Sequence, residues 1–379
     1  MDNIGIYIHI PFCRAKCYYC DFTSFAGKEN IIDRYIDNLI GELGLYKDKV
    51  KDKKIYSIFI GGGTPSHIDE KHIVRIMKFI RENFNVDDLE EASIEINPGT
   101  LDKNKAQAYK DAGINRASMG VQTLNPDHLK KIGRIHDEKQ VYESYETLRR
   151  AGFDNINLDF IFGLPDETIE DVSKNLDLIE EIKPEHISYY GLILEEGTVL
   201  YKLEGKGELN IPSDEKEREM YYLIKKRLKS MGYLHYEISN FSLRGRECKH
   251  NVLYWNILPY IGVGLSSHSY YGGKRYWNHD NFQDYFKAID KGELPIEGEE
   301  KSTLKDEISE FAIMGLRFID GIDKQIFRDR FGKSIEYYYK EAIKDHIEDG
   351  LLEENERSIK LTDKGLDLSN KVEVDFLLE

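Results

Sequence analysis

Residues 8–22, IHIPFCRAKCYYCDF, place three of the chain's four cysteines in one short loop, as Cys13-x3-Cys17-x2-Cys20. The remaining thiol, Cys248, lies far away in the sequence, so the spacing does not indicate a disulfide scaffold. Thiolates are ligands for zinc and for iron–sulfur clusters. Structural zinc sites usually combine two separated pairs of ligands, whereas three thiolates on one loop can hold a [4Fe–4S] cluster and leave one iron open. We therefore expect an iron–sulfur cluster, with a zinc-stabilised binding module as the alternative.

Short β-rich runs alternate with longer amphipathic helical patterns over the first two thirds of the chain. This alternation implies right-handed crossovers and a parallel sheet. Six strands are fewer than the eight that close a full barrel, so the sequence predicts the α/β class and a partial (β/α)6 TIM-like barrel. The predicted strands are 5–10, 55–60, 92–97, 116–121, 155–160 and 186–194. The predicted helices between them are 30–48, 69–83, 102–112, 138–150 and 167–181.

The alternation stops after a long charged helical pattern at 214–232. The next part of the chain is rich in Tyr, Gly, Asn and Trp, and it is followed by helical patterns and a short hairpin-like end, ERSIKLTDKG. We therefore expect a core barrel at 1–232 and an aromatic, Gly-rich connecting segment at 233–300. A C-terminal, mainly helical and winged-helix-like domain is expected at 301–379.

Composition limits the function classes that the chain can belong to. The chain has 379 residues, 40% of them hydrophobic and 32% charged, as in ordinary globular proteins. Its formal net charge of −16 argues against non-specific binding to nucleic acid, which needs a basic surface. No apolar run is long enough to span a bilayer, and the N-terminal sequence lacks the pattern of a signal peptide. We expect a cytoplasmic protein.

Glycines and polar residues follow the predicted strands directly. The carboxyl ends of parallel strands form one face of such a fold, and active sites lie there, so these loops should converge on one pocket. The run Gly61-Gly62-Gly63-Thr64 follows the second strand directly, and glycines let a backbone approach a ligand closely. Glu95 lies at the end of the third strand. The successive strand–loop units supply three further polar residues, Gln122, Arg134 and Asp159. These residues could form either a structural or a functional polar network.

The cysteine loop after a first strand, followed by GGGTPS at 61–66, resembles the radical S-adenosylmethionine (SAM) superfamily. The resemblance implies that the open iron of the cluster chelates SAM and that the glycine motif contacts the amino group of SAM. It also implies that Tyr19 lies near the adenine, although simple packing explains an aromatic there equally well. The SAM-binding residues implied in this way are Tyr7, Tyr19, Gly62, Gly63, Thr64, Glu95, Gln122, Arg134 and Asp159.

Motifs along nearly the whole chain, among them YIHIPFC, FIGGGTPS, EINPGT, GRIH and FGLPDET, resemble the oxygen-independent coproporphyrinogen III oxidase family. The oxidases of that family carry a fourth cysteine two residues after the third, and an N-terminal extension. This chain has Phe22 at that position, and six residues precede Tyr7. In both features, the missing fourth cysteine and the short segment before Tyr7, the chain resembles the heme-chaperone (HemW) group of the family. The resemblance therefore implies a heme chaperone without coproporphyrinogen oxidase activity, with a coproporphyrinogen oxidase as the alternative.

The segment 248–255, CKHNVLYW, resembles a motif of the same group. His250 with the neighbouring Tyr254 and Trp255 has the chemistry of an axial iron ligand and of apolar faces for a porphyrin. Cys248 is a second candidate ligand. A packed core histidine among aromatic residues explains the segment equally well.

The resemblance implies that the chain binds a [4Fe–4S] cluster, SAM and heme. It implies as partners heme or porphyrin, a heme-receiving protein and an electron donor such as flavodoxin or ferredoxin, but no nucleic acid. Peripheral membrane association and a homodimer are compatible with it. His268 and Tyr270, in a Gly-flanked stretch, either line the mouth of the pocket or belong to an ordinary turn.

Overall fold

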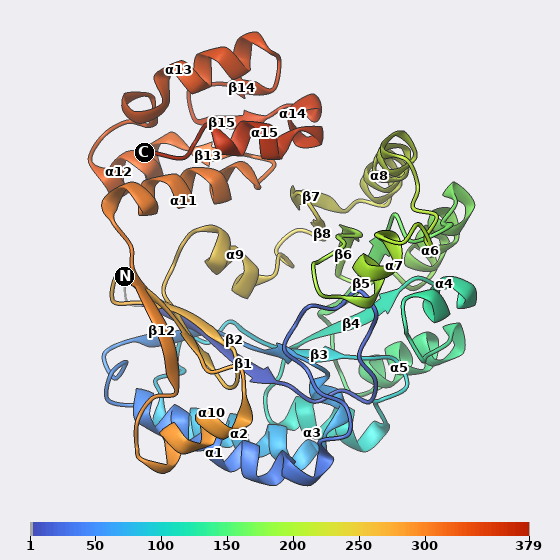
Figure 1. The fold of residues 1–379 in the computed structure, drawn as a ribbon, viewed down its shortest axis with the longest axis vertical. Helices are drawn as coiled ribbons and strands as arrows, with labels where there is room; N and C mark the ends of the chain where they lie inside the picture. Colours follow the sequence, from blue (N-terminus) through green and yellow to red (C-terminus); the bar gives the residue numbers. More distant parts are fainter. Residues whose placement is uncertain (1–2, 379) are drawn as a thin grey trace.

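One large sheet organises the protein (Figure 1). The computed structural model describes residues 3–378, and twelve of the strands among them form this sheet. In their order across the sheet, the strands are β12 (Ile296–Lys301), β11 (Lys274–Asn278), β10 (His268–Tyr271), β9 (Tyr260–Val263), β1 (Asn3–Ile10), β2 (Lys54–Gly62), β3 (Glu91–Ile96), β4 (Arg116–Gln122), β5 (Ile156–Phe162), β6 (His186–Gly191), β8 (Asn240–Ser242) and β7 (Leu234–Glu237).

The middle of the sheet is parallel and deeply buried. Strands β1 to β6 pair in parallel in chain order, which confirms the predicted open (β/α)6 barrel. In β1, Ile4, Ile6, Ile8 and Ile10 are wholly buried and, as alternate residues of a strand, share one face of the sheet. The structure adds β9 as a further parallel strand beside β1. Sequence reasoning missed β9 because it is only four residues long and lies in a Gly- and Tyr-rich stretch.

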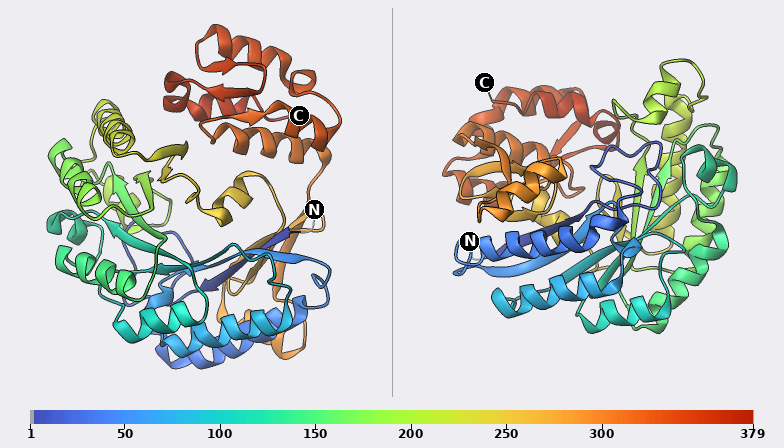
Figure 2. Two further views of the ribbon diagram at one scale, coloured as in Figure 1. Left: turned by 180° about the vertical axis from the view of Figure 1, so that it is seen from behind. Right: turned by 60° about the horizontal axis from the view of Figure 1, so that its bottom comes forward.

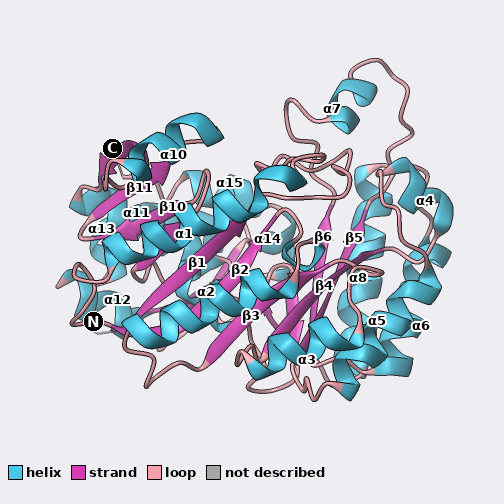
Figure 3. Cartoon of the chain, turned by 90° about the horizontal axis from the view of Figure 1, so that it is seen from below, coloured by secondary structure: helices cyan, strands magenta, loops and turns pink. Residues whose placement is uncertain are grey.

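The crossover helices α1 to α3 cover the outer face of the sheet (Figure 3). Helix starts follow their capping residues: Asp137 caps the start of α5 and Thr168 caps the start of α6, each with a reciprocal capping box. The predicted helices are confirmed within a few residues at each end. The helices of this part are α1 (Ile32–Tyr46), α2 (Glu70–Asn83), α3 (Lys103–Asp111), α4 (Pro126–Lys131), α5 (Glu138–Arg150), α6 (Ile169–Ile182), α7 (Val199–Glu204) and α8 (Asp214–Ser230).

The stretch predicted as a connecting segment, 233–300, supplies strands to both edges of the same sheet. Strands β8 and β7 continue the sheet beyond β6 in antiparallel pairs, while β10 to β12 do so beyond β9. Between these two groups, α9 (Lys249–Trp255) crosses the inner face of the sheet (Figure 1). The division at 232 and 300 stays a prediction.

The C-terminal part is helical and carries a small three-stranded sheet in the order β13-β15-β14. It lies on the side of the main sheet opposite α1 to α3 (Figures 1 and 2) and has its own hydrophobic core. Among the described residues, no helix is long and apolar enough to cross a membrane. The remaining elements are α10 (Phe282–Asp290), α11 (Leu304–Leu316), β13 (Ile322–Asp323), α12 (Lys324–Phe331), α13 (Ile335–Glu348), β14 (Leu352–Glu354), β15 (Ser358–Leu361), α14 (Asp363–Asp367) and α15 (Ser369–Val374).

Candidate functional site

The cysteine loop leaves the carboxyl end of β1 and is fixed to its neighbours by backbone hydrogen bonds. The Cys13 N–H donates to the carbonyl of Phe25 at 3.0 Å, and the Phe25 N–H donates to the carbonyl of Pro11 at 2.8 Å. Further along the loop, the Tyr18 N–H donates to the carbonyl of Ile132 at 2.9 Å. All four cysteines are free thiols, so the loop's shape does not depend on a disulfide.

A cavity of about 490 Å³, the smaller of two adjoining cavities, opens beside this loop. All three clustered cysteines line it, together with residues from the ends of strands β2 to β6. The structure thus brings the predicted loops together at one face, and the ligand roles of their residues stay predictions. The predicted SAM-binding residues that line this smaller cavity are Tyr19, Gly62, Gly63, Thr64, Glu95, Gln122, Arg134 and Asp159.

The chemistry of the three thiols suits an iron–sulfur cluster, although among the described residues no three ligating side chains are grouped closely enough to hold a single metal ion. Two hydrogen-bond donors point at the thiol sulfurs, Thr64 Oγ1 at 3.5 Å from Cys13 Sγ and Arg134 Nη1 at 3.7 Å from Cys17 Sγ. Burial raises the pKa of Cys13, and burial raises the pKa of Cys20 to about 11. Thiolates in this cavity therefore need a cationic partner, and cluster iron supplies that charge.

The glycine run packs against the cysteine loop. The Gly63 N–H donates to the carbonyl of Ile10 at 2.9 Å, and the Thr64 N–H donates to the carbonyl of Phe12 at 2.8 Å. Gly62 has a φ of +110°, and a Cβ built there would lie 2.4 Å from the His9 ring. Glycine is required here because the end of β2 approaches β1 and its loop so closely. The motif therefore has a packing role in addition to the ligand contact predicted for it.

Two partly buried carboxyl groups, from Glu95 and Asp159, face the smaller cavity. Glu95 Oε2 accepts a hydrogen bond from the Gly62 N–H at 3.0 Å. Burial, together with the charge of Asp159, raises the pKa of Glu95 to about 8. Asp159 accepts from Ser118 Oγ at 3.0 Å and from Asn157 Nδ2 at 2.7 Å, and burial raises its pKa as well. Both carboxyl groups would be stabilised in their charged forms by a cationic ligand.

The backbone at the end of β4 is strained. Gln122 adopts a φ of 66°, in the region that only glycine enters readily, beside an irregularity in the pairing with β5. Arg134 Nη2 donates to Asn97 Oδ1 at 2.9 Å and to the carbonyl of Gly120 at 2.5 Å, which fixes the guanidinium against this strand end. Such strain is typical of functional sites.

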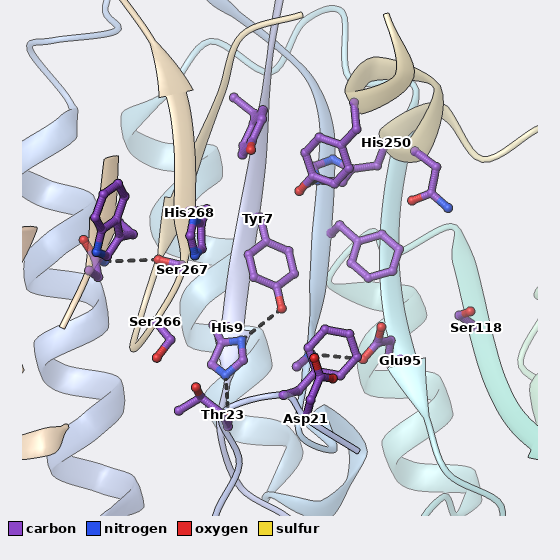
Figure 4. A pocket seen from close by; sticks show the side chains of 18 of the residues that line it. Tyr7, His9, Asp21, Thr23, Glu95, Ser118, His250, Ser266, Ser267 and His268 are labelled. Atoms are coloured by element: carbon purple, nitrogen blue, oxygen red, sulfur yellow. Dashed lines mark hydrogen bonds between the residues drawn. The ribbon is translucent and has the colours of Figure 1, made fainter. Parts of the chain in front are cut away.

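A second, larger cavity of about 710 Å³ adjoins the first on the inner face of the sheet (Figure 4). It lies between β1 to β6, helix α9 and strands β9 to β12. Phe22, whose exposed fraction is 62%, lines both cavities and lies between them. The other residues shared by the two cavities are Asp21, Gly62, Glu95, Ser118, Asp159 and Tyr190. Aromatic residues of the larger cavity include Tyr7, Phe59, Tyr254, Tyr260 and Trp277.

Tyr7 lines the larger cavity and not the smaller one, although it was predicted among the SAM-binding residues. Its hydroxyl lies 2.9 Å from His9 Nδ1, and His9 Nε2 lies 2.8 Å from the carbonyl oxygen of Thr23 (Figure 4). Because a carbonyl can only accept, Nε2 carries the proton and the Tyr7 hydroxyl donates to Nδ1. Burial lowers the pKa of His9 to about 4, so the ring is neutral. Tyr7 is thereby connected to the backbone that follows the third cysteine.

His250, the predicted heme ligand, lies wholly buried at one side of the larger cavity. Its Nδ1 lies 2.9 Å from Ser57 Oγ and its Nε2 lies 2.8 Å from the Tyr254 hydroxyl. The ring also stacks on Phe59, with 5.4 Å between centroids. Both nitrogens are thus engaged, as in a packed core histidine. Cys248, the second candidate, lines neither cavity, and its thiol donates to Glu91 Oε1 at 3.5 Å.

Sequence reasoning missed Arg116, at the start of β4. Its side chain is almost wholly buried and lines the larger cavity. Its Nε lies 3.9 Å from Glu91 Oε2, and neither Nε nor Nη1 has a hydrogen-bond partner among the described residues. An arginine as the first residue of the predicted strand RASMGV was the available signal.

Comparisons with known proteins agree with this geometry. Sequence models of the "Radical SAM superfamily" and of the "HemN C-terminal domain" match residues 7–179 and 302–368. The chain is 38% identical to the heme chaperone HemW of Bacillus subtilis, over 98% of this chain and 99% of that protein. It is 40% identical to the heme chaperone HemW of Lactococcus lactis, over 98% and 97% of the two chains.

A solved structure shows the same fold. Coproporphyrinogen III oxidase (HemN) from Escherichia coli, described as a radical SAM enzyme, superimposes on this chain with a TM-score of 0.85. The superposition covers 99% of this chain and 90% of the oxidase chain. Its sequence identity is 24%, so this likeness establishes the fold alone.

Proposed function

Because this chain belongs to the HemW heme-chaperone family of the radical SAM superfamily, we propose that it binds heme in the larger cavity and delivers it to a recipient protein. The smaller cavity takes a [4Fe–4S] cluster and SAM, as membership of the radical SAM superfamily implies. The two sites adjoin through Phe22 and Glu95, which line both cavities.

In this proposal the chain's own residues divide the work of the smaller cavity. Cys13, Cys17 and Cys20 hold the cluster. Thr64 and Arg134 donate hydrogen bonds to the sulfurs, which lowers the cost of burying thiolate charge. When bound, the cluster supplies an open iron that chelates SAM and, on reduction, chemistry that cleaves it.

The carboxyl groups of Glu95 and Asp159 would face the cationic parts of SAM, and Gln122, whose backbone is strained, lines the same cavity at the end of β4. Tyr19 and the glycine run complete the lining. Tyr7 lies in the larger cavity, so any contact that it makes with SAM is across the boundary between the two cavities.

The charge of the larger cavity is the observation that favours a heme chaperone over a coproporphyrinogen oxidase. Among the described residues that line it, Arg116 is the only lysine or arginine. Coproporphyrinogen III carries a propionate on each pyrrole ring, whereas heme keeps half as many. A cavity lined by more carboxyl groups than basic side chains repels carboxylates, so it disfavours the substrate that carries more propionates. The carboxyl groups that line the cavity are Asp21, Glu95, Asp159, Asp280 and Glu297.

The partners follow from the same proposal. The heme-receiving protein meets the open side of the larger cavity. An acidic electron donor such as flavodoxin or ferredoxin approaches the cysteine loop, where Arg14 and Lys16 are exposed on a chain with a net charge of −16. We propose a cytoplasmic location, with peripheral membrane association and homodimer formation as further parts of the delivery step.

One experiment tests the proposed function. The protein is reconstituted anaerobically with iron and sulfide, and one portion is titrated with hemin while a second is given coproporphyrinogen III, SAM and a reductant. We expect hemin binding that saturates, visible in the Soret band, and no formation of protoporphyrinogen. Rapid conversion of coproporphyrinogen would overturn the proposal. Stoichiometric zinc without iron and sulfide in the purified protein would overturn the cluster assignment.

A further inference from the structure

Within residues 3–378, three histidines line the larger cavity, and only one of them has free ring nitrogens. His9 bonds Tyr7 and the carbonyl of Thr23, and His250 bonds Ser57 and Tyr254. Among the described residues, no group hydrogen-bonds the imidazole of His268, which begins β10 and is exposed to the cavity. Figure 4 draws His268 and His250 on the two sides of Tyr7.

The imidazole of His268 is held by the neighbouring strands and not by hydrogen bonds. His268 pairs directly with Trp277 across the antiparallel ladder of β10 and β11, so both side chains project from the same face. Their rings lie 6.0 Å apart between centroids at an interplanar angle of 26°. Trp277 in turn pairs with Gly298 of β12, and a Cβ built on Gly298 would lie 2.4 Å from the indole. The glycine therefore leaves the space that the indole occupies.

These residues form a platform across three adjacent strands, Gly298, Trp277 and His268. The platform presents one imidazole edge to a cavity whose other walls carry aromatic rings. Burial and the charge of Arg275 lower the pKa of His268, so the ring is neutral near pH 7. A neutral imidazole with an unshared nitrogen is the form that ligates iron.

We propose that His268, and not His250, is the protein ligand of the heme iron. This assignment rests on the proposed function. The unengaged nitrogen of His268 can bind iron without breaking any hydrogen bond of the protein. Ligation by His250 would require its Nε2 to give up the Tyr254 hydroxyl or its Nδ1 to give up Ser57, within a ring that is wholly buried. Trp277 packs beside the ligand and limits its rotation.

The test uses hemin titrations of the full-length protein and of His268→Ala, followed by absorption and electron paramagnetic resonance spectroscopy. We expect His268→Ala to lose the spectrum of a histidine-ligated ferric heme and to bind hemin about tenfold or more weakly. Free imidazole added to this variant should restore the histidine-type spectrum, because it can enter the space left by the side chain. A merely structural role of His268 would not produce that rescue.

His279→Ala is the matched control, because His279 follows the same strand pair but does not line the cavity. It should keep the spectrum and affinity of the unaltered protein. Circular dichroism shows whether each variant is folded. The assignment is overturned if His268→Ala keeps the histidine-ligated spectrum, and most directly if His250→Ala loses it. Failure of the unaltered protein to bind hemin would contradict the proposed function itself, and the assignment with it.

Discussion

The two cavities of this protein are built in different ways. The smaller cavity is formed by loops that follow successive parallel strands, each within a few residues of its strand end. The larger cavity is formed where α9 and strands β9 to β12, all from the last third of the chain, fold back over the inner face of β1 to β6. Local motifs therefore specify the first site, whereas the second exists only through contacts between distant segments.

The two cavities also differ in how their polar groups are satisfied. In the smaller cavity, partly buried carboxyl groups and thiols have raised pKa values, so the protein groups alone disfavour the charges that its ligands need. In the larger cavity, two of the lining histidines already bond protein side chains, His9 with Tyr7 and His250 with Tyr254. The smaller cavity therefore depends on its ligands for charge balance, whereas the rings of His9 and His250 in the larger cavity are already held by protein groups.

The buried ion pair of Arg116 provides the most severe test of the larger cavity. Arg116→Met removes the cation beside Glu91 and leaves that carboxylate buried, where it also accepts hydrogen bonds from the start of α9. We expect the free energy of unfolding to fall by about 3–5 kcal/mol in chemical denaturation. Arg246→Met is the control: its ion pair with Asp154 is exposed, and its loss should cost less than about 0.5 kcal/mol. Equal losses in both variants would contradict a larger cavity held by this pair.

Gly62→Ala tests the close approach of the end of β2 to the His9 ring, where the two cavities adjoin. Alanine at a φ of +110° is strained, and its Cβ would displace the His9 ring. We expect a loss of about 3 kcal/mol in the free energy of unfolding. The matched control is Gly207→Ala, at a φ of +72° with open space around it, which should cost about 1 kcal/mol. Similar costs for both would show that backbone conformation alone requires the glycine.

Glu95→Gln tests the charge balance of the smaller cavity. Because the folded-state pKa of Glu95 is raised to about 8, the native protein holds a proton that the unfolded chain releases at lower pH. Without cluster and SAM, stability should therefore fall as pH rises from about 4.5 towards 8. Glutamine keeps an acceptor for the Gly62 N–H and removes this fall, so the variant should be about 2–3 kcal/mol more stable at pH 8 and nearly equal at pH 4.5. Parallel pH dependences in the two proteins would contradict the charge imbalance.

Phe22→Ala should have the smallest effect. Phe22 lies between the cavities with most of its side chain exposed, so its removal should change the free energy of unfolding by no more than about 0.5 kcal/mol. The iron and sulfide content after reconstitution should stay the same, because the ring supplies no ligand. A large loss of either quantity would show that Phe22 closes the smaller cavity and does more than divide it from the larger one.

The contrast between the cavities also explains how much could be predicted from the sequence. Period-two apolar runs such as β1 and capped helices such as α6 are local, so the barrel and the residues that line the smaller cavity were predictable. Strand β9 and the platform of Trp277 and His268 were not, because such short strands gain their identity from tertiary pairing with segments distant in the sequence. Arg116 was missed because its burial depends on Glu91, a residue of the adjacent strand.

The central claim is that heme and the iron–sulfur cluster occupy separate, adjoining sites. Thiolates also ligate heme iron, so the most direct test is a hemin titration of a protein in which Cys13, Cys17 and Cys20 are all replaced by serine. The account predicts that this variant holds no iron–sulfur cluster and binds hemin within about twofold of the unaltered affinity, with the same histidine-type spectrum. Loss of hemin binding, or a change of the axial ligand in the spectrum, would contradict it.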